Sequence, residues 1–392
     1  MASDSASHAD QRPLTGWEKN LLGVRIDRVH TLLPGLVWVI VLAWFSLWLS
    51  EFLGVSVLGF EKTPISAVMV AILLGIILRT LIPLPANAKP GLTFSVKKIL
   101  RLGIILLGIR LTLFDVFRLG LFGVPIVIVC IISALLITSL INRWVGLPRR
   151  LGTLIATGTA ICGVSAIVAT APAIDAEEEE SAYAVAVVTI FGLLATLLYP
   201  YLVHQIFQGD ALKAGLFLGT SVHDTSQVVG SARVYADVYA QSVALDAATI
   251  TKLVRNVFMA LVIPLMAFLH NRSQESSSQS SADVRVRKLF PLFVLGFLTV
   301  AILRTIGDAG LQTGANAFGV LPGASWSTLV STIRTWAGRF LVIALAGVGL
   351  STDIRNFKAL GLKPFFVGLA AALSVGVVSY LTITLLGDLV SL

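Results

Sequence analysis

The segment "SVHDTSQ" holds two ionisable side chains, His223 and Asp224, among apolar neighbours. A carboxylate is costly to bury in a membrane and usually marks a functional site, and a histidine titrates near neutral pH. This pair could relay a proton, hold a coupling cation such as sodium, or bind a substrate. A buried ion pair with a purely structural role is the alternative.

Two basic residues, Lys252 and Arg255, follow in "TITKLVRNVFMAL". Residues three positions apart lie on one face of a helix, so both side chains are expected on the same side. They could pair with Asp224 or attract an anionic substrate. Long basic side chains near the end of a span also extend to the membrane interface, and the sequence leaves this second interpretation open.

Two similar elements, "GTAICGVSAIV" at 158–168 and "GTSVHDTSQVV" at 219–229, are rich in glycine and hydroxyl groups. In lipid, non-helical backbone survives only where protein or a cavity surrounds it. We therefore expect two broken or discontinuous helices whose freed N–H groups face an anion, the first broken at Gly158 and Thr159. Close helix packing through small residues is the alternative. The predicted substrate-binding residues are Gly158, Thr159, Ser165, Gly219, Thr220, Ser221, Gln227, Lys252 and Arg255.

These residues belong to a chain suited to a lipid bilayer. Of its 392 residues 56% are hydrophobic and 13% charged, with a mean hydropathy of +0.90, whereas soluble domains are about 25% charged. A bilayer core about 30 Å thick needs roughly 20 apolar residues per helix. We therefore predict an all-α polytopic membrane protein of about eleven transmembrane helices, at 34–54, 63–84, 94–113, 119–142, 151–174, 181–206, 211–230, 246–270, 288–306, 327–350 and 361–387.

The basic residues predict the orientation. With the N-terminus inside, twenty Lys and Arg residues fall in cytoplasmic segments and five outside, as the positive-inside rule requires. Treating 211–230 as a re-entrant hairpin would move the basic loop 272–288 outside and spoil this pattern, so eleven full crossings are favoured and the C-terminus is placed outside. The acidic run 175–181 then also lies outside, where it either caps the next helix or forms a cation-attracting vestibule.

The chain divides into two parts. Residues 1–33 lack the features of a signal peptide and form a cytoplasmic segment, which either lies along the headgroups as an interfacial helix or is a disordered tail. Residues 34–392 form one integral membrane domain, with a candidate core at 151–270 and a flexible polar loop at 271–287.

Internal repeats connect distant parts of this domain. "ILRT" occurs at 77–80 and 302–305, and 107–120 resembles 346–361. The second to fourth spans thus recur as the ninth to eleventh in opposite orientation, and inverted repeats are typical of secondary transporters. The elements at 158–168 and 219–229 fit this scheme poorly, because two crossings between them would make them parallel.

Other function classes lack support. The net charge of +8 is spread between spans, so no nucleic-acid partner is expected. The sequence has no metalloprotease, Walker or dinucleotide-binding motif. Its two cysteines, Cys130 and Cys162, cannot form a C-x-x-C motif and are expected to pack as small hydrophobic or neutral side chains. We predict no enzyme activity, no cofactor and no metal site.

At "GTAICGVSAIVATAPAI", "EEESAYAVAVVTIFG", "GTSVHDTSQVVGSA" and "TKLVRN" the sequence resembles the YeiH-like family of bacterial inner-membrane proteins, over roughly residues 30 to 390. Members are commonly labelled as sulfate exporters. The resemblance implies kinship with the bile acid, arsenite and auxin carriers, whose folds contain inverted five-helix repeats with broken crossing helices. Because a fold does not fix a substrate, the sulfate label is a weaker guide than the fold.

The sequence thus predicts an inner-membrane secondary transporter that moves a small anion, sulfate or a related oxyanion or sulfonate, by alternating access. An ion channel or passive ion pathway is the alternative, as is a carrier for another organic anion. The expected partners are the lipid bilayer and the anion. Coupling to protons or sodium, the direction of transport and assembly into a homo-oligomer stay open.

Overall fold

The computed structural model describes residues 18, 23–58, 63, 65–272, 292–313, 316–353, 355 and 362–390. Within these ranges the chain is helical except for turns and one short antiparallel pairing of β1 (Asn316–Ala317) with β2 (Leu321–Pro322). Most of the predicted N-terminal segment and of the predicted loop 271–287 lies outside the described residues. The all-helical prediction is confirmed for the part that the structure describes.

Six of the described helices are long and apolar enough to cross a membrane one by one, and a seventh span arises if a pair bent by 43° is counted as one. The six are Ile26–Val57, Leu113–Val145, Glu178–Ile206, Leu292–Gln312, Gly323–Ser351 and Leu362–Leu389; the bent pair is Val243–Val257 with Met259–His270. The other predicted stretches contain shorter or interrupted helices. Two of those interruptions, at 151–174 and 211–230, position the candidate site.

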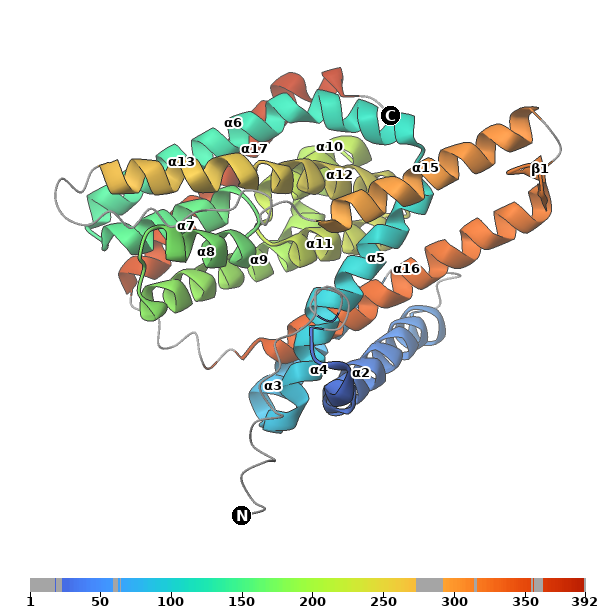
Figure 1. The fold of residues 1–392 in the computed structure, drawn as a ribbon, viewed down its shortest axis with the longest axis horizontal. Helices are drawn as coiled ribbons and strands as arrows, with labels where there is room; N and C mark the ends of the chain where they lie inside the picture. The colour runs from blue at the N-terminus through green and yellow to red at the C-terminus, as the bar shows by residue number, and fades with distance from the viewer. Residues whose placement is uncertain are drawn as a thin grey trace, which may run out of the picture.

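The helices pack as two bodies (Figure 1). One body, the scaffold, is centred on the long α16, which lies against α3 so closely that a Cβ on Gly75 would come within 2.8 Å of the Gly349 backbone. A π-helical turn at Ser95–Ile99 joins α4 to α5. The scaffold helices are α2 (Leu33–Glu51), α3 (Ala67–Leu81), α4 (Lys89–Phe94), α5 (Leu100–Leu107), α15 (Leu292–Thr313) and α16 (Gly323–Ser351).

The other body, the core, contains the predicted site segments and is enclosed on one side by the packed pair α6 and α17. Its centre is apolar, and Cys130 is fully buried there, as predicted for a small hydrophobic side chain. The core helices are α6 (Leu113–Val145), α7 (Arg149–Ala160), α8 (Val164–Thr170), α9 (Glu178–Ile206), α10 (Ala211–Ser221), α11 (Thr225–Val238), α12 (Val243–Val257), α13 (Met259–Arg272) and α17 (Leu362–Leu386).

The first interrupted stretch folds back on itself, forming the α7–α8 hairpin. The chain reverses at Ile161–Gly163, so that the Ile167 side chain lies 2.8 Å from where a Cβ on Gly158 would be. Arg149 at the start of α7 donates to the Leu269 carbonyl of α13 (3.4 Å). Asp175, beyond α8, interacts electrostatically with the adjacent His270. Both ends of the hairpin therefore lie at the same end of the core, and the stretch predicted as one span at 151–174 is folded back on itself.

The second interrupted stretch, the α10–α11 hairpin, reverses at Val222–Asp224. Its far end returns to the end of α9, where the ring of Tyr239 stacks on that of His204 with centroids 3.6 Å apart. Asp210, the N-cap of α10, lies in the same region. The stretch predicted as one span at 211–230 is therefore folded back as well. Because α9 separates the two hairpins, they enter the core from opposite ends.

The positions of the two reversals correct a second prediction. Gly158 lies inside α7, and the break comes three to five residues later, at Ile161–Gly163. A glycine is needed at 158 because a Cβ there would collide with Ile167 of the returning helix. Gly219 likewise lies inside α10, where a Cβ would come within 2.7 Å of Thr251 on α12. The alternative interpretation of these two glycines, close helix packing, is the one that the structure supports.

The acidic run at 175–181 starts α9. Glu180 accepts a hydrogen bond from the backbone N–H of Glu177 (3.0 Å), and Glu178 and Glu179 complete an acidic first turn. Carboxylates at a helix N-terminus offset its partial positive charge, so the capping interpretation is confirmed. The run lies at the end of the core that holds Arg149 and His270.

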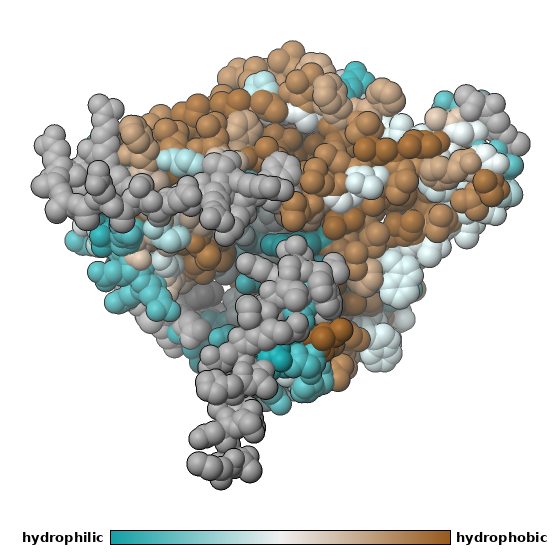
Figure 2. Space-filling model, in the orientation of Figure 1, coloured by the Kyte–Doolittle hydropathy of each residue, from teal (hydrophilic) through white to brown (hydrophobic). Residues whose placement is uncertain are grey.

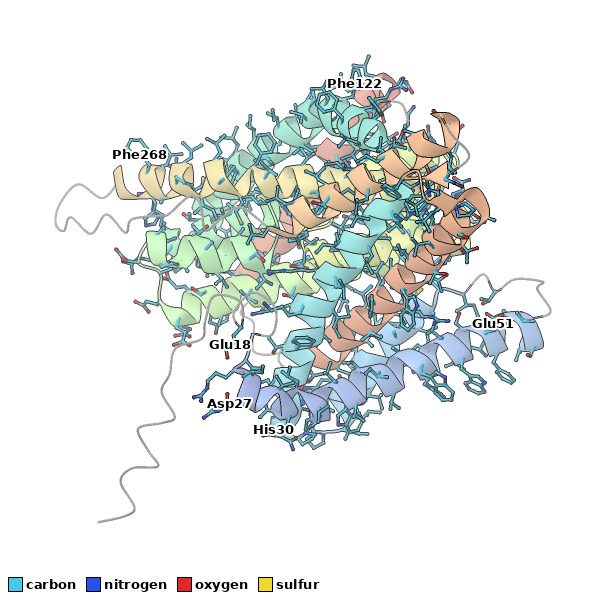
Figure 3. The ribbon with its side chains drawn as sticks, turned by 45° about the vertical axis from the view of Figure 1, so that its right-hand side comes forward. Glu18, Asp27, His30, Glu51, Phe122 and Phe268 are labelled. Atoms are coloured by element: carbon cyan, nitrogen blue, oxygen red, sulfur yellow. The ribbon has the colours of Figure 1, made fainter. Side chains whose placement is uncertain are left out.

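The outer surface is largely apolar. Hydrophobic side chains cover the faces formed by α6, α13 and α15 (Figure 2). Phe122 of α6 and Phe268 of α13 point away from the bundle and are 45% and 59% exposed (Figure 3). On the first helix, Asp27 and Glu51 lie at opposite ends of an apolar stretch (Figure 3). This pattern is that of a protein surrounded by lipid.

Candidate functional site

The tips of the two hairpins meet in the middle of the core. Gly163 adopts φ +67° and ψ −125°, a conformation that only glycine adopts readily. A Cβ on Gly163 would lie 3.3 Å from both Cα and Cβ of Asp224. The element that contains Gly163 and the element that contains Asp224 are therefore in direct contact, although 60 positions separate them in the sequence. The similarity between the two sequence elements thus corresponds to two similar structures.

Asp224 is the N-cap of α11. Its Oδ1 accepts from the Ser226 backbone N–H (2.8 Å) and from the Ser226 hydroxyl (2.6 Å). Gln227 completes a capping box: its Oε1 accepts from the Asp224 N–H (3.2 Å), and its Nε2 donates to the Thr189 carbonyl of α9 (3.2 Å). This arrangement fixes the start of α11 against α9. Asp224 stays partly exposed, whereas Gln227 is buried.

Arg255 of α12 is fully buried and binds the backbone of both hairpins. Its Nε donates to the Ala160 carbonyl (2.7 Å) and its Nη1 to the Thr220 carbonyl (2.6 Å), while Nη2 donates to the Thr159 carbonyl. These carbonyls end α7 and α10, where a helix lacks internal partners for its C=O groups and carries a partial negative charge. One guanidinium therefore caps two half-helices.

Lys252, one turn earlier on α12, also binds backbone carbonyls of both hairpins, at the reversals themselves. Its Nζ donates to the carbonyls of Ile161 (2.7 Å), Val222 (3.1 Å) and His223. Lys252 is also 0% exposed, so neither basic side chain extends to an interface as the alternative interpretation supposed. Among the described residues neither side chain lies within 4.0 Å of a carboxylate, so the predicted pairing with Asp224 is not a direct ion pair.

His223 lies at the tip of the α10–α11 hairpin and is 2% exposed. Its carbonyl accepts from Lys252, but no protein atom in the described part of the chain forms a hydrogen bond with its Nδ1. The interpretation of His223 and Asp224 as a structural ion pair has no support in the described residues, because no contact of 4.0 Å or less joins them.

The remaining predicted residues separate into buried and accessible ones. The Thr220 hydroxyl bonds the Ser379 hydroxyl of α17 (2.6 Å), and the Ser221 hydroxyl donates to the Phe217 carbonyl (2.6 Å). Thr159 contributes its carbonyl to Arg255. Of all the predicted residues, only Ser165 is exposed and only Asp224 is partly so. Ser165 and Asp224 are therefore the predicted residues with side-chain surface left open to contact a ligand.

Three residues that the sequence analysis did not single out belong to the same region. Gly163 forms the close contact, and Thr225, partly exposed beside Asp224, accepts a hydrogen bond from Asn256 Nδ2 (3.2 Å). The Asn256 Oδ1 is buried without a protein partner among the described residues. Asn256 directly follows Arg255 and ends the stretch "TKLVRN", and these were the signals in the sequence that could have identified it.

The described residues contain no group of three or more His, Cys, Asp or Glu side chains that could hold a metal ion. Cys162 contacts Met259 through sulfur atoms 3.6 Å apart and is 4% exposed. The arrangement at the tips is thus a polar contact that two buried basic side chains hold together, with one partly exposed carboxylate and neighbouring hydroxyl groups.

Comparisons with known proteins identify relatives along nearly the whole chain. Residues 34–368 match the family model described as "Conserved hypothetical protein 698". A UPF0324 membrane protein of Streptococcus agalactiae is 32% identical over 355 residues, covering 91% of this chain and 98% of that protein. A UPF0324 membrane protein of Fusobacterium nucleatum is 30% identical over 314 residues, covering 79% and 87%. No solved structure gives a significant match.

Proposed function

We propose that this chain, which belongs to the family of membrane proteins described as UPF0324 and as conserved hypothetical protein 698, is a secondary transporter. It would carry a small oxyanion across the inner membrane. The names of the relatives state no substrate. Sulfate or a sulfonate is proposed from the charge at the hairpin tips and from the resemblance to the YeiH-like family. Alternating access of the tips to the two sides of the membrane is the proposed mechanism.

The observation that carries the proposal is the charge balance at the tips. Lys252 and Arg255 are both 0% exposed, and Asp224 is the carboxylate beside them. The three groups together leave one positive charge without a counter-ion. The carbonyls at the ends of α7 and α10 offset part of this buried charge, and an anion beside Ser165 and Thr225 would balance the remainder.

The division into core and scaffold supplies two bodies that can move relative to each other. Polar contacts join them in the described chain: Arg110, which ends a short turn after α5, forms a bidentate pair with Asp246 of α12 (2.6 and 3.1 Å). The Ser66 hydroxyl before α3 donates to Asp237 of α11 (3.0 Å). We propose that these contacts close one side of the carrier and break when the core shifts.

Coupling to a proton is assigned to Asp224 rather than to His223. Asp224 is partly exposed, whereas His223 is buried beside Lys252 and Arg255. Protonation of Asp224 would remove the negative charge next to the proposed anion and so favour binding of the anion. A proton gradient would then drive anion movement.

The re-entrant hairpins change the proposed topology from eleven crossings to nine, with the N-terminus inside and the C-terminus outside. Two missing crossings leave the basic loop 272–288 on the inside, so the positive-inside pattern is kept: only Lys213 moves out. The two hairpins now have opposite orientations, which removes the conflict with an inverted repeat. The nine proposed crossings are α2, α3, α4 with α5, α6, α9, α12 with α13, α15, α16 and α17.

This topology predicts the labelling of single cysteines by a membrane-impermeant maleimide on intact cells. Gln208→Cys is expected to react, because the α9–α10 turn is placed outside, and Glu179→Cys is expected to be protected. Both positions are exposed, whereas the native Cys130 and Cys162 are buried and should stay unlabelled. Ser242→Cys, which is outside in either topology, is the matched control. Labelled Glu179→Cys with protected Gln208→Cys would restore the eleven-crossing topology.

Transport in proteoliposomes tests the function. We expect uptake of labelled sulfate or a small sulfonate, stimulated by a proton gradient and trans-stimulated by unlabelled anion, since trans-stimulation requires a carrier. Ser165→Leu is expected to lower the initial rate about 10-fold to 100-fold, because a hydrogen bond to a charged group contributes about 1.5–3 kcal/mol. Asp224→Asn should lose the stimulation by the proton gradient.

Val168→Leu is the control for added bulk, because Val168 is exposed by 61% on the same short helix as Ser165. This variant should transport at the wild-type rate. Anion flux without trans-stimulation would favour the channel alternative. A full rate for Ser165→Leu would remove Ser165 from the site, and the absence of flux for every small oxyanion would refute the proposed substrate class.

A further inference from the structure

Three backbone carbonyls from two different hairpins converge on one buried ammonium group. Ile161 at the end of α7 and Val222 and His223 at the end of α10 all accept from Lys252 Nζ, at 2.7 Å and 3.1 Å for the first two. We call these three carbonyls the carbonyl cage. Lys252 belongs to neither hairpin but to α12, which packs against both α10 and α11.

Backbone carbonyls at the unwound ends of half-helices can bind cations. The C-terminal end of a helix carries a partial negative charge, and in many transporters such carbonyls coordinate a sodium ion. An ammonium group offers three donors and no acceptor, which matches the three carbonyls here. The carbonyl cage therefore has the composition of a metal-cation site, with a side chain occupying it.

We propose that Lys252 is a built-in substitute for a coupling cation. Its ammonium holds the two hairpin tips together in the way that a bound sodium ion would. Since Lys252 is 0% exposed and covalently attached, sodium would have to displace it to bind in the cage. The protein is therefore independent of sodium at this place.

The neighbouring residues leave little room for a second cation at the same tips. Arg255 already takes the carbonyls of Thr159, Ala160 and Thr220, and its Nη1 also lies 3.4 Å from the Val222 carbonyl. The carboxylate of Asp224 accepts from Ser226 and caps α11. A positively charged side chain thus fills each position at which backbone oxygens from both hairpins meet.

Truncating Lys252 should convert the carbonyl cage into a vacant site for a monovalent cation. The carbonyl–cation part of this inference rests on contacts alone, whereas its consequence for coupling rests on the proposed transport function. A ligand that binds only the native state raises the melting temperature in a saturable way. Cation-dependent thermal stability therefore measures the cage without any transport assay.

The experiment compares melting temperatures of the purified full-length protein in detergent, in choline, sodium and ammonium chloride at constant ionic strength. For the wild type, no saturable difference between choline and sodium is expected. Lys252→Ala should melt several degrees lower in choline, and sodium or ammonium should restore part of the loss. Lys252→Met, which keeps the apolar stem, should melt lower as well but respond less, because the methionine side chain fills the cage.

Lys213→Met is the matched control, because Lys213 pairs with the exposed Asp388 at the surface (2.6 Å) and contacts no hairpin tip. It should show no cation-dependent stability. Saturable stabilisation of the wild type by sodium would overturn the proposal, as would a Lys252→Ala variant that melts like the wild type in choline. If neither Lys252 variant folds, the sodium titration of the wild type alone still decides.

The outcomes also separate this inference from the transport proposal. If Lys252→Ala shows cation-dependent stability but the wild type transports no anion, the inference about the carbonyl cage stands and the transport proposal is refuted. Anion transport by a wild type whose melting temperature and flux both rise with sodium would support the carrier and refute the role of Lys252.

Discussion

Arg255→Met is expected to lower the free energy of unfolding by several kcal/mol. The substitution removes the partners of the Thr159, Ala160 and Thr220 carbonyls, all in fully enclosed surroundings. An unsatisfied buried polar group costs about 1–3 kcal/mol, so three of them make this one of the most damaging single changes in the core. The melting temperature in detergent should fall by about 5 °C or more.

Two further variants give the result its meaning. Arg255→Lys keeps the charge but offers a single ammonium in place of a planar fork, so it should lie between the wild type and Arg255→Met. Arg339→Met is the control, because Arg339 is an exposed arginine of α16 whose guanidinium lies 5.1 Å from the ring centre of Trp336. If Arg255→Met melted as high as Arg339→Met, Arg255 would not hold the hairpins together.

Gly163→Val is expected to abolish transport, lowering the rate at least about 100-fold. A residue with a Cβ is strained at φ +67° and ψ −125°, at a cost of roughly 1–3 kcal/mol. That Cβ would also approach Asp224 to 3.3 Å, and the two branches of valine would reach further. The tips would have to separate, which moves Asp224 away from Ser165. Initial rates of anion uptake in proteoliposomes measure the effect.

Gly146→Val separates strain from contact. Gly146 ends α6 at φ +71°, yet a Cβ there would meet no atom within 4 Å. This variant should lose a similar amount of stability from backbone strain while transporting at nearly the wild-type rate. Equal rates for Gly163→Val and the wild type would mean that the contact of the tips has no part in transport.

Much of the helical architecture could be predicted from local sequence. The long apolar stretches gave the positions of α2, α6, α9, α15, α16 and α17 because burying a helical backbone in lipid requires about 20 apolar residues in a row. The two elements rich in glycine and hydroxyl groups were identified as interrupted helices because such residues favour a break in a helix, and broken backbone in a membrane must be enclosed by protein or line a cavity. His223, Asp224, Lys252 and Arg255 were recognised as unusual because charge within an apolar segment is costly.

The fold-back of these elements could not be predicted, because hydropathy does not distinguish a straight span from two half-helices folded side by side. Both arrangements use about 20 apolar residues. The charge count gave no warning either: one re-entrant hairpin would have spoiled the positive-inside pattern, but two of them cancel. The reversal at Gly163 depends on one backbone conformation and on the packing of Ile167 against Gly158.

The sequence by itself therefore determined which residues are chemically exceptional in this protein, since the free-energy cost of placing a side chain in a membrane depends on the residue type. Only the tertiary structure decided what each of them contacts. Lys252 and Arg255 carry the positive charge that an anion site needs. In the structure, however, they donate their hydrogen bonds to backbone carbonyls. Those carbonyls become available because α7 and α10 end next to each other in space. No local sequence pattern predicts that these two helix ends lie side by side.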